Sequence, residues 1–217
     1  MTVQIAIDGP AGSGKSTLAK GLARALHLPY VNTGLMYRAL TRRALDAGVN
    51  LDDGEALAGL ARTLTVDLDL TLDPPELRID GRRPGPELTT PEVERAVSLV
   101  SSHPPVRAVL VEQQRRLGGS GGVMEGRDIG RVVLADAPVK IYLDAVPIER
   151  AERRTEERGE GRSLAEEVAR RDALDSKTNP FVPASDAVRL DTSGRTADET
   201  LAEALRLVRE RLGEVPA

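Results

Sequence analysis

Cysteine and tryptophan are both absent from this 217-residue chain, and aromatic residues make up only 2% of it. Without cysteine, disulfides, thiolate metal sites and cysteine nucleophiles are excluded. The scarcity of aromatic rings leaves few platforms on which the bases of a single-stranded nucleic acid could stack. No apolar stretch approaches the length of a membrane span, and no apolar segment typical of a signal peptide is present near the start. We therefore expect a soluble, cytoplasmic protein with no membrane partner.

The net charge of the chain is −4 and its isoelectric point is about 5.4. Proteins that bind the phosphate backbone of nucleic acids carry a basic surface, so this charge balance argues against a nucleic-acid partner. It favours a small anionic ligand held by a few arginines. The length favours one sizeable domain with insertions over two separate cores.

The most specific motif is the segment GPAGSGKST at residues 9–17, which satisfies the phosphate-loop pattern G-x-x-x-x-G-K-[ST]. It follows an apolar run typical of a strand and precedes leucines at helical spacing, which is the context the pattern requires. The glycines let backbone N–H groups approach phosphate oxygens, and the following helix directs its positive end at the same anion. We expect ATP to contact Gly9, Pro10, Ala11, Gly12, Ser13, Gly14, Lys15, Ser16 and Thr17.

Two side chains of this loop are predicted to act directly on the nucleotide. Lys15 would reach the β- and γ-phosphates. The hydroxyl of Ser16 would hold Mg²⁺, the cofactor that we expect. A glycine-rich turn alone would be weak evidence, so the prediction depends on these side chains and the flanking elements together.

Short apolar runs alternate with amphipathic stretches along most of the chain, which is the pattern of a parallel sheet with helices on both faces. Two further runs, 66–70 and 77–80, alternate apolar and polar residues and predict a small antiparallel insertion on one face of the core. We predict the other strands near residues 3–7, 29–32, 123–124, 139–143 and 187–190, and helices near 16–26, 35–47, 91–101, 105–117, 147–158, 163–174 and 197–212.

Four further segments of the chain are distinctive: IDGP at residues 7–10, TGLMYR at 33–38, EGRDIG at 125–130 and DAPVKIYLDA at 136–145. Together they resemble the bacterial cytidylate kinases, which belong to the nucleoside-monophosphate kinase family of phosphate-loop phosphotransferases. They fall in the family's order at comparable separations, so the resemblance covers essentially the whole chain. It implies an α/β fold with a five-stranded parallel core, helices on both faces, a small antiparallel insert that binds the monophosphate, and a helical lid.

The resemblance also implies the division of the chain and the reaction. The core would comprise residues 1–65, 101–150 and 179–217, the insert residues 66–100, and the lid residues 151–178. The enzyme would transfer the γ-phosphoryl group of ATP to CMP or dCMP, giving ADP and CDP or dCDP, and would be a monomer. The residues agree that no catalytic base is needed, because the second pKa of the acceptor phosphate is about 6 and this phosphate is already an oxyanion at neutral pH.

Family positions supply the acceptor site. By resemblance, Arg38 and Arg127 hold the acceptor phosphate with Thr33 nearby, and guanidinium forks suit phosphate oxygens. The positions that read the cytosine edge are Ser98, Arg107 and Asp128. Arg171 and Asp175 lie near the acceptor phosphate and sugar, and the lid arginines Arg154, Arg158 and Arg162 could close over the γ-phosphate. Transfer itself would depend on Lys15, Arg127, Arg154 and Arg158.

Several of these residues have a purely structural alternative. The lid arginines alternate with glutamates, and Glu149 with Arg153 forms a favourable i, i+4 pair, so a solvated charged face explains much of that helix. Asp128 could cap the turn after its strand, and Ser98 could be an ordinary helix hydroxyl.

The sequence departs from the family pattern at two points. Where the family usually has Asp-Gly-Arg-Asp, this chain has Glu125, whose carboxylate must be directed differently because it is one methylene longer. Where the family offers an arginine before a proline, this chain has Lys177, which would act as a point charge without bidentate geometry.

Three other functions remain open at this stage. A uridylate or thymidylate kinase is opposed by Asp128, because uracil would reverse the hydrogen bond that reads the exocyclic amine. A nucleotide switch that transfers nothing would not need an acceptor insert and an arginine-rich lid. A nucleic-acid ATPase is opposed by the acidic charge and the scarce aromatic residues.

Overall fold

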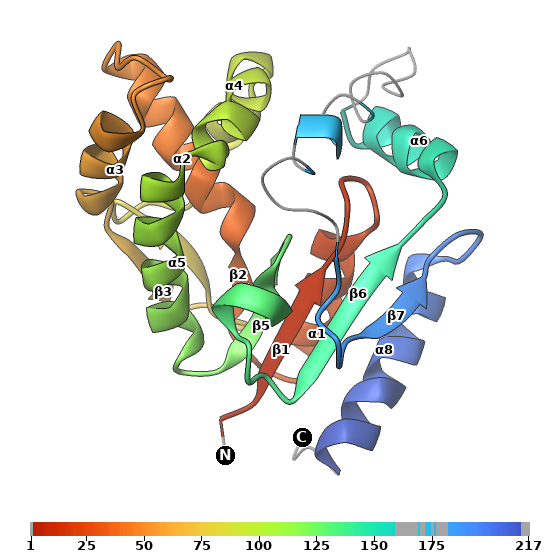
Figure 1. The fold of residues 1–217 in the computed structure, drawn as a ribbon. Helices are drawn as coiled ribbons and strands as arrows, with labels where there is room; N and C mark the ends of the chain where they lie inside the picture. The colour runs from red at the N-terminus through yellow and green to blue at the C-terminus, as the bar shows by residue number, and fades with distance from the viewer. Residues whose placement is uncertain (1, 159–168, 170–171, 175, 177–181, 214–217) are drawn as a thin grey trace.

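The computed structural model describes residues 2–158, 169, 172–174, 176 and 182–213. In this part of the chain a seven-stranded sheet runs through the molecule in the order β3-β4-β2-β5-β1-β6-β7 (Figure 1). Its strands are β1 (Gln4–Asp8), β2 (Tyr30–Asn32), β3 (Val66–Asp69), β4 (Glu76–Ile79), β5 (Gly122–Gly126), β6 (Val139–Asp144) and β7 (Val188–Asp191). None of the helices in the described residues is long and apolar enough to cross a membrane.

Five neighbouring strands, β2, β5, β1, β6 and β7, form the predicted parallel core. The structure corrects the prediction of five strands to seven. The antiparallel hairpin β3–β4 does not lie on a face of the core but extends the sheet at its β2 edge. Tyr30 pairs there with Glu76 and donates its backbone N–H to the carbonyl of Pro75 over 2.8 Å. The edge of β2 is thereby satisfied by the insertion, since unpaired strand edges are unfavourable.

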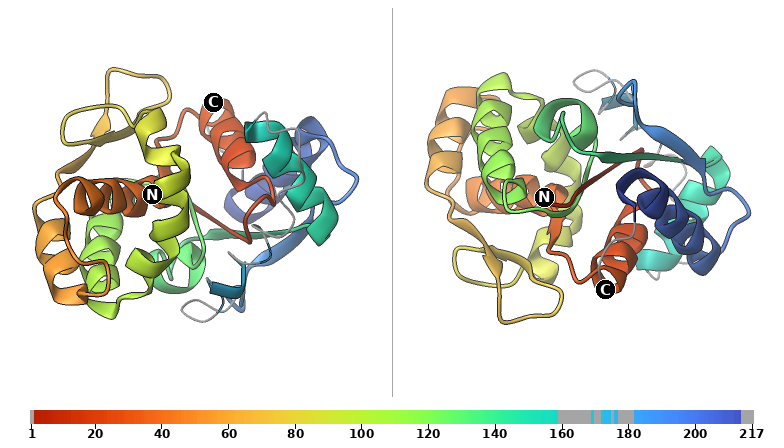
Figure 2. Two further views of the ribbon diagram at one scale, coloured as in Figure 1. Left: turned by 90° about the horizontal axis from the view of Figure 1, so that it is seen from above. Right: turned by 90° about the horizontal axis from the view of Figure 1, so that it is seen from below.

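Helices cover both faces of the sheet (Figure 2). Along β1, Ile5 and Ile7 face one layer and Ala6 faces the other, as the two-residue period of a strand requires. The first layer contains α1 (Lys15–Ala25) and α8 (Ala197–Leu212). The second contains α2 (Thr33–Asp46), α3 (Gly54–Arg62), α4 (Pro91–Ser102), α5 (Pro104–Gly118) and the 3₁₀ turn η1 (Pro86–Thr89). A π-helical turn η2 (Ile129–Val133) follows β5, and α6 (Pro147–Arg158) follows β6.

Helix α3 was not predicted from the sequence. It begins after Asp53, whose carboxylate accepts from the backbone N–H groups of Glu55 and Ala56, and it buries Leu57, Ala58 and Ala61. The helix predicted near residues 163–174 lies largely outside the described residues.

The parallel arrangement brings the carboxyl ends of β1, β2, β5 and β6 to one edge of the sheet, at the top of Figure 1. Each of these strands leads there into a segment that the sequence analysis singled out. In open α/β sheets this edge is where ligands bind.

Candidate active site

The phosphate loop connects β1 to α1 at this edge. Gly12 and Gly14 adopt positive φ angles of 73° and 86°, a conformation that favours glycine. A Cβ atom at Gly12 would lie 2.4 Å from the carbonyl oxygen of Arg150, so only glycine allows α6 to approach the loop this closely. The side chain of Lys15 turns back over the loop, and its Nζ donates to the carbonyl of Pro10 over 2.6 Å.

Arg150 supports the loop from α6, a role that the sequence analysis did not predict. Its buried guanidinium donates through Nη1 to the carbonyl of Ala11 over 3.0 Å and to Asp172 over 2.6 Å. Its Nε donates to the carbonyl of Ala145 over 3.2 Å. Arg150 shares a helix face with Arg154, but the spacing could not show that one of them faces the loop and the other the cavity.

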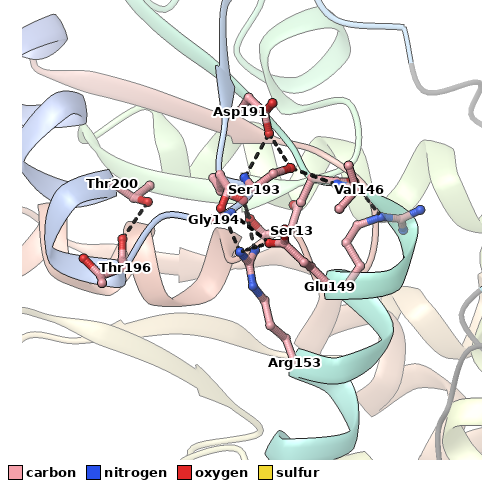
Figure 3. Close-up of polar contacts among 12 residues, drawn as sticks. Ser13, Val146, Glu149, Arg153, Asp191, Ser193, Gly194, Thr196 and Thr200 are labelled. Carbon is pink, nitrogen blue, oxygen red and sulfur yellow. Dashed lines mark hydrogen bonds and ion pairs between the residues drawn. The ribbon is translucent and has the colours of Figure 1, made fainter.

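The base of α6 is fixed by a second set of contacts (Figure 3). The predicted pair of Arg153 with Glu149 is present, with 3.1 Å between Nη2 and Oε2. Arg153 also donates to the side-chain oxygen of Thr192 over 2.9 Å and to its carbonyl over 2.8 Å, and Glu149 accepts from the N–H of Gly194 over 3.0 Å. Thr192 in turn donates to the carbonyl of Ser13 over 3.4 Å. Arg153 therefore holds α6 against the phosphate loop and the β7–α8 connection.

Glu125, at the end of β5, is buried beside the predicted metal-binding hydroxyl. Ser16 donates to its Oε2 over 3.0 Å and Tyr30 donates to its Oε1 over 2.5 Å. Burial and the neighbouring Glu125 carboxylate raise the pKa of Tyr30, so this phenol stays protonated and remains a donor. The longer side chain at position 125 is thus directed at Ser16 and Tyr30.

These oxygen donors fit Mg²⁺. The ion prefers hard oxygen ligands, and in phosphotransferases it usually takes only one or two from the protein and the rest from phosphates and water. Ser16 and Glu125 supply such a pair. No cluster of three or more acidic, histidine or cysteine ligands occurs among the residues described by the structure.

Asp8, the last residue of β1, fixes the turn that follows β5. Its buried carboxylate accepts from the backbone N–H groups of Ile129 over 2.7 Å and Gly130 over 2.8 Å. Burial raises the pKa of Asp8 to about 6, because the loss of water outweighs these two hydrogen bonds. The turn carries Arg127 and Asp128, so Asp8 sets their position relative to the phosphate loop. The sequence analysis quoted Asp8 only as part of a motif.

The side chains of that turn face the phosphate loop and α5. Arg127 donates through Nη1 to the carbonyl of Gly9 over 2.8 Å, which places its guanidinium at the phosphate loop. Asp128 is buried and accepts from Nη2 of Arg107 on α5 over 2.5 Å. Thr33, at the start of α2, donates to the backbone carbonyl of Glu125 over 2.8 Å.

Two predicted phosphate-binding arginines meet on one carboxylate that the sequence analysis did not name. Glu94 of α4 accepts through Oε1 from Nε of Arg38 over 2.7 Å and through Oε2 from Nη2 of Arg154 over 3.4 Å. Arg38 comes from α2 and Arg154 from α6, so the contact joins both sides of the cavity described next. The sequence contained no signal for it, because the three residues are more than fifty positions apart.

One cavity brings most of the predicted site residues together. From the phosphate loop its lining includes Ala11, Gly12, Gly14, Lys15, Ser16 and Thr17, and from the predicted acceptor site and lid it includes Thr33, Arg38, Ser98, Arg107, Arg127, Asp128 and Arg154. Gly9, Pro10 and Ser13 belong to the loop but do not line the cavity, and Ser13 is fully buried. Arg162, Arg171, Asp175 and Lys177, together with the side chain of Arg158, lie outside the described residues. Contact of all these residues with substrate stays a prediction.

Comparison with known proteins agrees with this geometry. The family model described as cytidylate kinase matches residues 5–210. A cytidylate kinase of Geobacillus kaustophilus is 45% identical over 220 residues, covering 97% of this chain and 98% of that protein. A cytidylate kinase of Lysinibacillus sphaericus is 42% identical over 219 residues, with the same coverage of both chains.

Among solved structures, TT1252 from Thermus thermophilus matches with a TM-score of 0.51 at 21% identity. The match covers 98% of this chain and 99% of that one, and it supports the α/β fold alone. The family match spans nearly the whole chain, and the two relatives are 45% and 42% identical over nearly their full length. The chain therefore belongs to the cytidylate kinase family.

Proposed function

We propose that this protein is a cytidylate kinase that transfers the γ-phosphoryl group of ATP to CMP or dCMP, giving ADP and CDP or dCDP. The observation that carries the proposal is that one cavity is lined both by the phosphate loop and by the predicted acceptor residues Arg38, Arg107 and Asp128. A nucleotide switch or an ATPase needs only the first of these two sets. We further propose that the enzyme acts in the cytoplasm as a monomer.

Transfer in this site requires alignment and charge neutralisation rather than a base. The acceptor phosphate is an oxyanion at neutral pH, so it attacks without prior proton removal. Lys15 would leave the carbonyl of Pro10 and bind the β- and γ-phosphates, while Arg127, already at the loop, would stabilise the transferring group. Bound Mg²⁺ would neutralise charge between the phosphates, with Ser16 and Glu125 as the residues that hold it.

Cytosine would be read by the pair Arg107 and Asp128. The carboxylate of Asp128 would accept from the exocyclic amine, and Arg107 would donate to N3 or O2 of the ring. Their 2.5 Å contact supports this reading, because it holds donor and acceptor side by side before the base arrives. Uracil presents an acceptor in place of the amine, so the Asp128 carboxylate would face a second acceptor where cytosine offers a donor. Ser98 lines the same cavity from α4.

The division into core, insert at residues 66–100 and lid at residues 151–178 is part of the proposal. The contact of Arg154 with Glu94 supports it, since it links the start of the proposed lid to the proposed insert across the cavity. In the closed state Arg158 and Arg162 would approach the γ-phosphate, Arg171 and Asp175 the acceptor phosphate and sugar, and Lys177 a phosphate oxygen.

The proposal is tested by ADP release from Mg-ATP with CMP, dCMP, UMP and AMP supplied in turn, beside a Lys15→Ala variant. We expect the fastest release with CMP and dCMP and its loss in the variant. Faster release with UMP or AMP would keep the phosphate loop and overturn the cytosine assignment. Equal release with and without an acceptor would show an ATPase instead.

A further inference from the structure

The carboxylate of Glu94 lies at the point where the two helical sides of the cavity meet. Its side chain is 4% exposed, and its two oxygens contact different arginines, Oε1 with Arg38 and Oε2 with Arg154. In Figures 1 and 2, α4 and α6 stand on opposite sides above the carboxyl ends of the strands. Through Glu94, α4 therefore contacts α6 across the cavity.

The contact with Arg38 leaves the phosphate-binding part of that arginine available. Glu94 engages Nε, and the two Nη atoms of Arg38 have no hydrogen-bond partner among the residues that the structure describes. Nη1 lies beside Gly34, because a Cβ atom built on that glycine would be 2.9 Å from it, and both residues line the cavity. A guanidinium held at Nε has a fixed orientation, and its planar terminal fork can then bind a phosphate through both Nη atoms.

The second contact of Glu94, with Arg154, lies on the α6 side of the cavity. The base of α6 is fixed by Arg150 and Arg153, and Arg154 of the same helix contacts Glu94 of α4. Two guanidinium groups this close would repel each other without an anion between them. The Glu94 carboxylate supplies that anion and brings both arginines to the same part of the cavity.

We propose that Glu94 is a positioning residue for phosphoryl transfer, which holds the fork of Arg38 toward the acceptor phosphate and draws Arg154 from α6 to the same place. This inference rests on the proposed function, since it assumes that the acceptor is a nucleoside monophosphate. In this proposal the Glu94 carboxylate couples the occupancy of the acceptor site to the position of Arg154 from the proposed lid. The carboxylate stays on Nε while the acceptor phosphate takes the Nη atoms.

A matched control lies two residues earlier on the same helix. Glu92 also pairs with an arginine of α2, Arg42, over 3.2 Å, but its side chain is 57% exposed and Arg42, unlike Arg38, does not line this cavity. Glu92→Ala removes an ion pair between the same two helices without touching either predicted phosphate ligand. The variants to compare are therefore Glu94→Ala, Glu94→Gln and Glu92→Ala.

The test combines CMP affinity by equilibrium dialysis, kcat and KM for CMP and ATP, and thermal unfolding. We expect Glu94→Ala to weaken CMP binding by about ten- to hundredfold, the effect of losing a hydrogen bond to a charged group, and to leave KM for ATP within about twofold. Glu94→Gln, which keeps one acceptor oxygen, should fall between wild type and Glu94→Ala. Glu92→Ala should match wild type in every constant.

A second measurement addresses Arg154. If Glu94 acts through it, the loss of kcat in Glu94→Ala combined with Arg154→Ala will be smaller than the product of the two single losses. Multiplicative losses would overturn this half of the inference.

The possible failures are distinguishable. Tighter CMP binding in Glu94→Ala would show that the carboxylate competes with substrate. Unchanged CMP binding, or equal losses of affinity for CMP and ATP with a lowered melting temperature, would show that Glu94 has a structural role. Each of these results overturns the inference about Glu94 and leaves the proposed function intact. Wild-type protein that binds CMP without forming CDP would overturn the proposed function, and dialysis would still decide the role of Glu94. Wild type that does not bind CMP would overturn both.

Discussion

Two glycines of the phosphate loop allow a matched test of how the loop packs against α6. Gly12 and Gly14 both have positive φ, so alanine at either position is strained by about 1–2 kcal/mol. Only Gly12 faces another element: its Cβ would lie 2.4 Å from the carbonyl oxygen of Arg150 and 3.0 Å from the Cα of that residue, whereas a Cβ at Gly14 meets nothing within 4 Å.

Because the atoms opposite Gly12 are backbone, they cannot rotate away, and either the loop or α6 must move. Such overpacking costs about 1–3 kcal/mol beyond the conformational strain. We therefore expect Gly14→Ala to destabilise the protein by about 1–2 kcal/mol and Gly12→Ala by about 2–5 kcal/mol. For a domain of this size each kcal/mol lowers the melting temperature by about 2–4 °C.

The assay is thermal and urea unfolding of the two variants and wild type without nucleotide, so that altered phosphate binding does not enter the comparison. A larger loss in Gly12→Ala, at an unchanged urea m-value, is the expected result. If both variants lose the same stability, the close approach of α6 to the loop does not exist in solution, and the support of the loop by Arg150 must be abandoned.

Three other predictions concern single side chains. Asp128→Asn should lower kcat/KM for CMP by about ten- to hundredfold and reduce the preference for CMP over UMP, since it removes the charged acceptor beside Arg107; an unchanged ratio of the two would contradict the assignment. Asp8 has a native pKa of about 6, raised from 3.8, so its contribution to stability is complete below pH 4 and is lost as the pH rises through 6. The free energy of unfolding of wild type relative to Asp8→Asn should thus fall by about 2 kcal/mol between pH 4 and pH 7, and a flat difference would refute the shift. Tyr30→Phe should raise the Mg²⁺ concentration needed for half-maximal activity with little change in KM for CMP, because it frees one oxygen of Glu125; a change confined to KM for CMP would contradict this role.

The parallel core and the phosphate loop could be predicted because their signals are local. Alternating apolar runs and the motif at residues 9–17 depend only on neighbours in the chain, and the structure confirms the fold that they indicate. The position of the β3–β4 hairpin was wrong, because a strand pattern shows that a hairpin forms but not which edge or face receives it. Helix α3 was missed because it is only nine residues long, although Asp53 provided a capping signal.

The supporting residues of the site could not be predicted for a different reason. Asp8, Glu94 and Arg150 act through partners that are distant in sequence, and a charged residue on a helix looks the same whether it faces solvent or a buried partner. Arg153 illustrates the reverse case, since its pairing with Glu149 followed from the i, i+4 spacing and is present.

The central claim is that the phosphate loop and the cytosine-reading residues serve one reaction in one cavity. The most direct test supplies ATP labelled with ³²P at the γ-position together with an equimolar mixture of CMP, dCMP, UMP and dTMP, and separates the products. We expect the label to appear in CDP and dCDP. Label found mainly in UDP, dTDP or inorganic phosphate would contradict it.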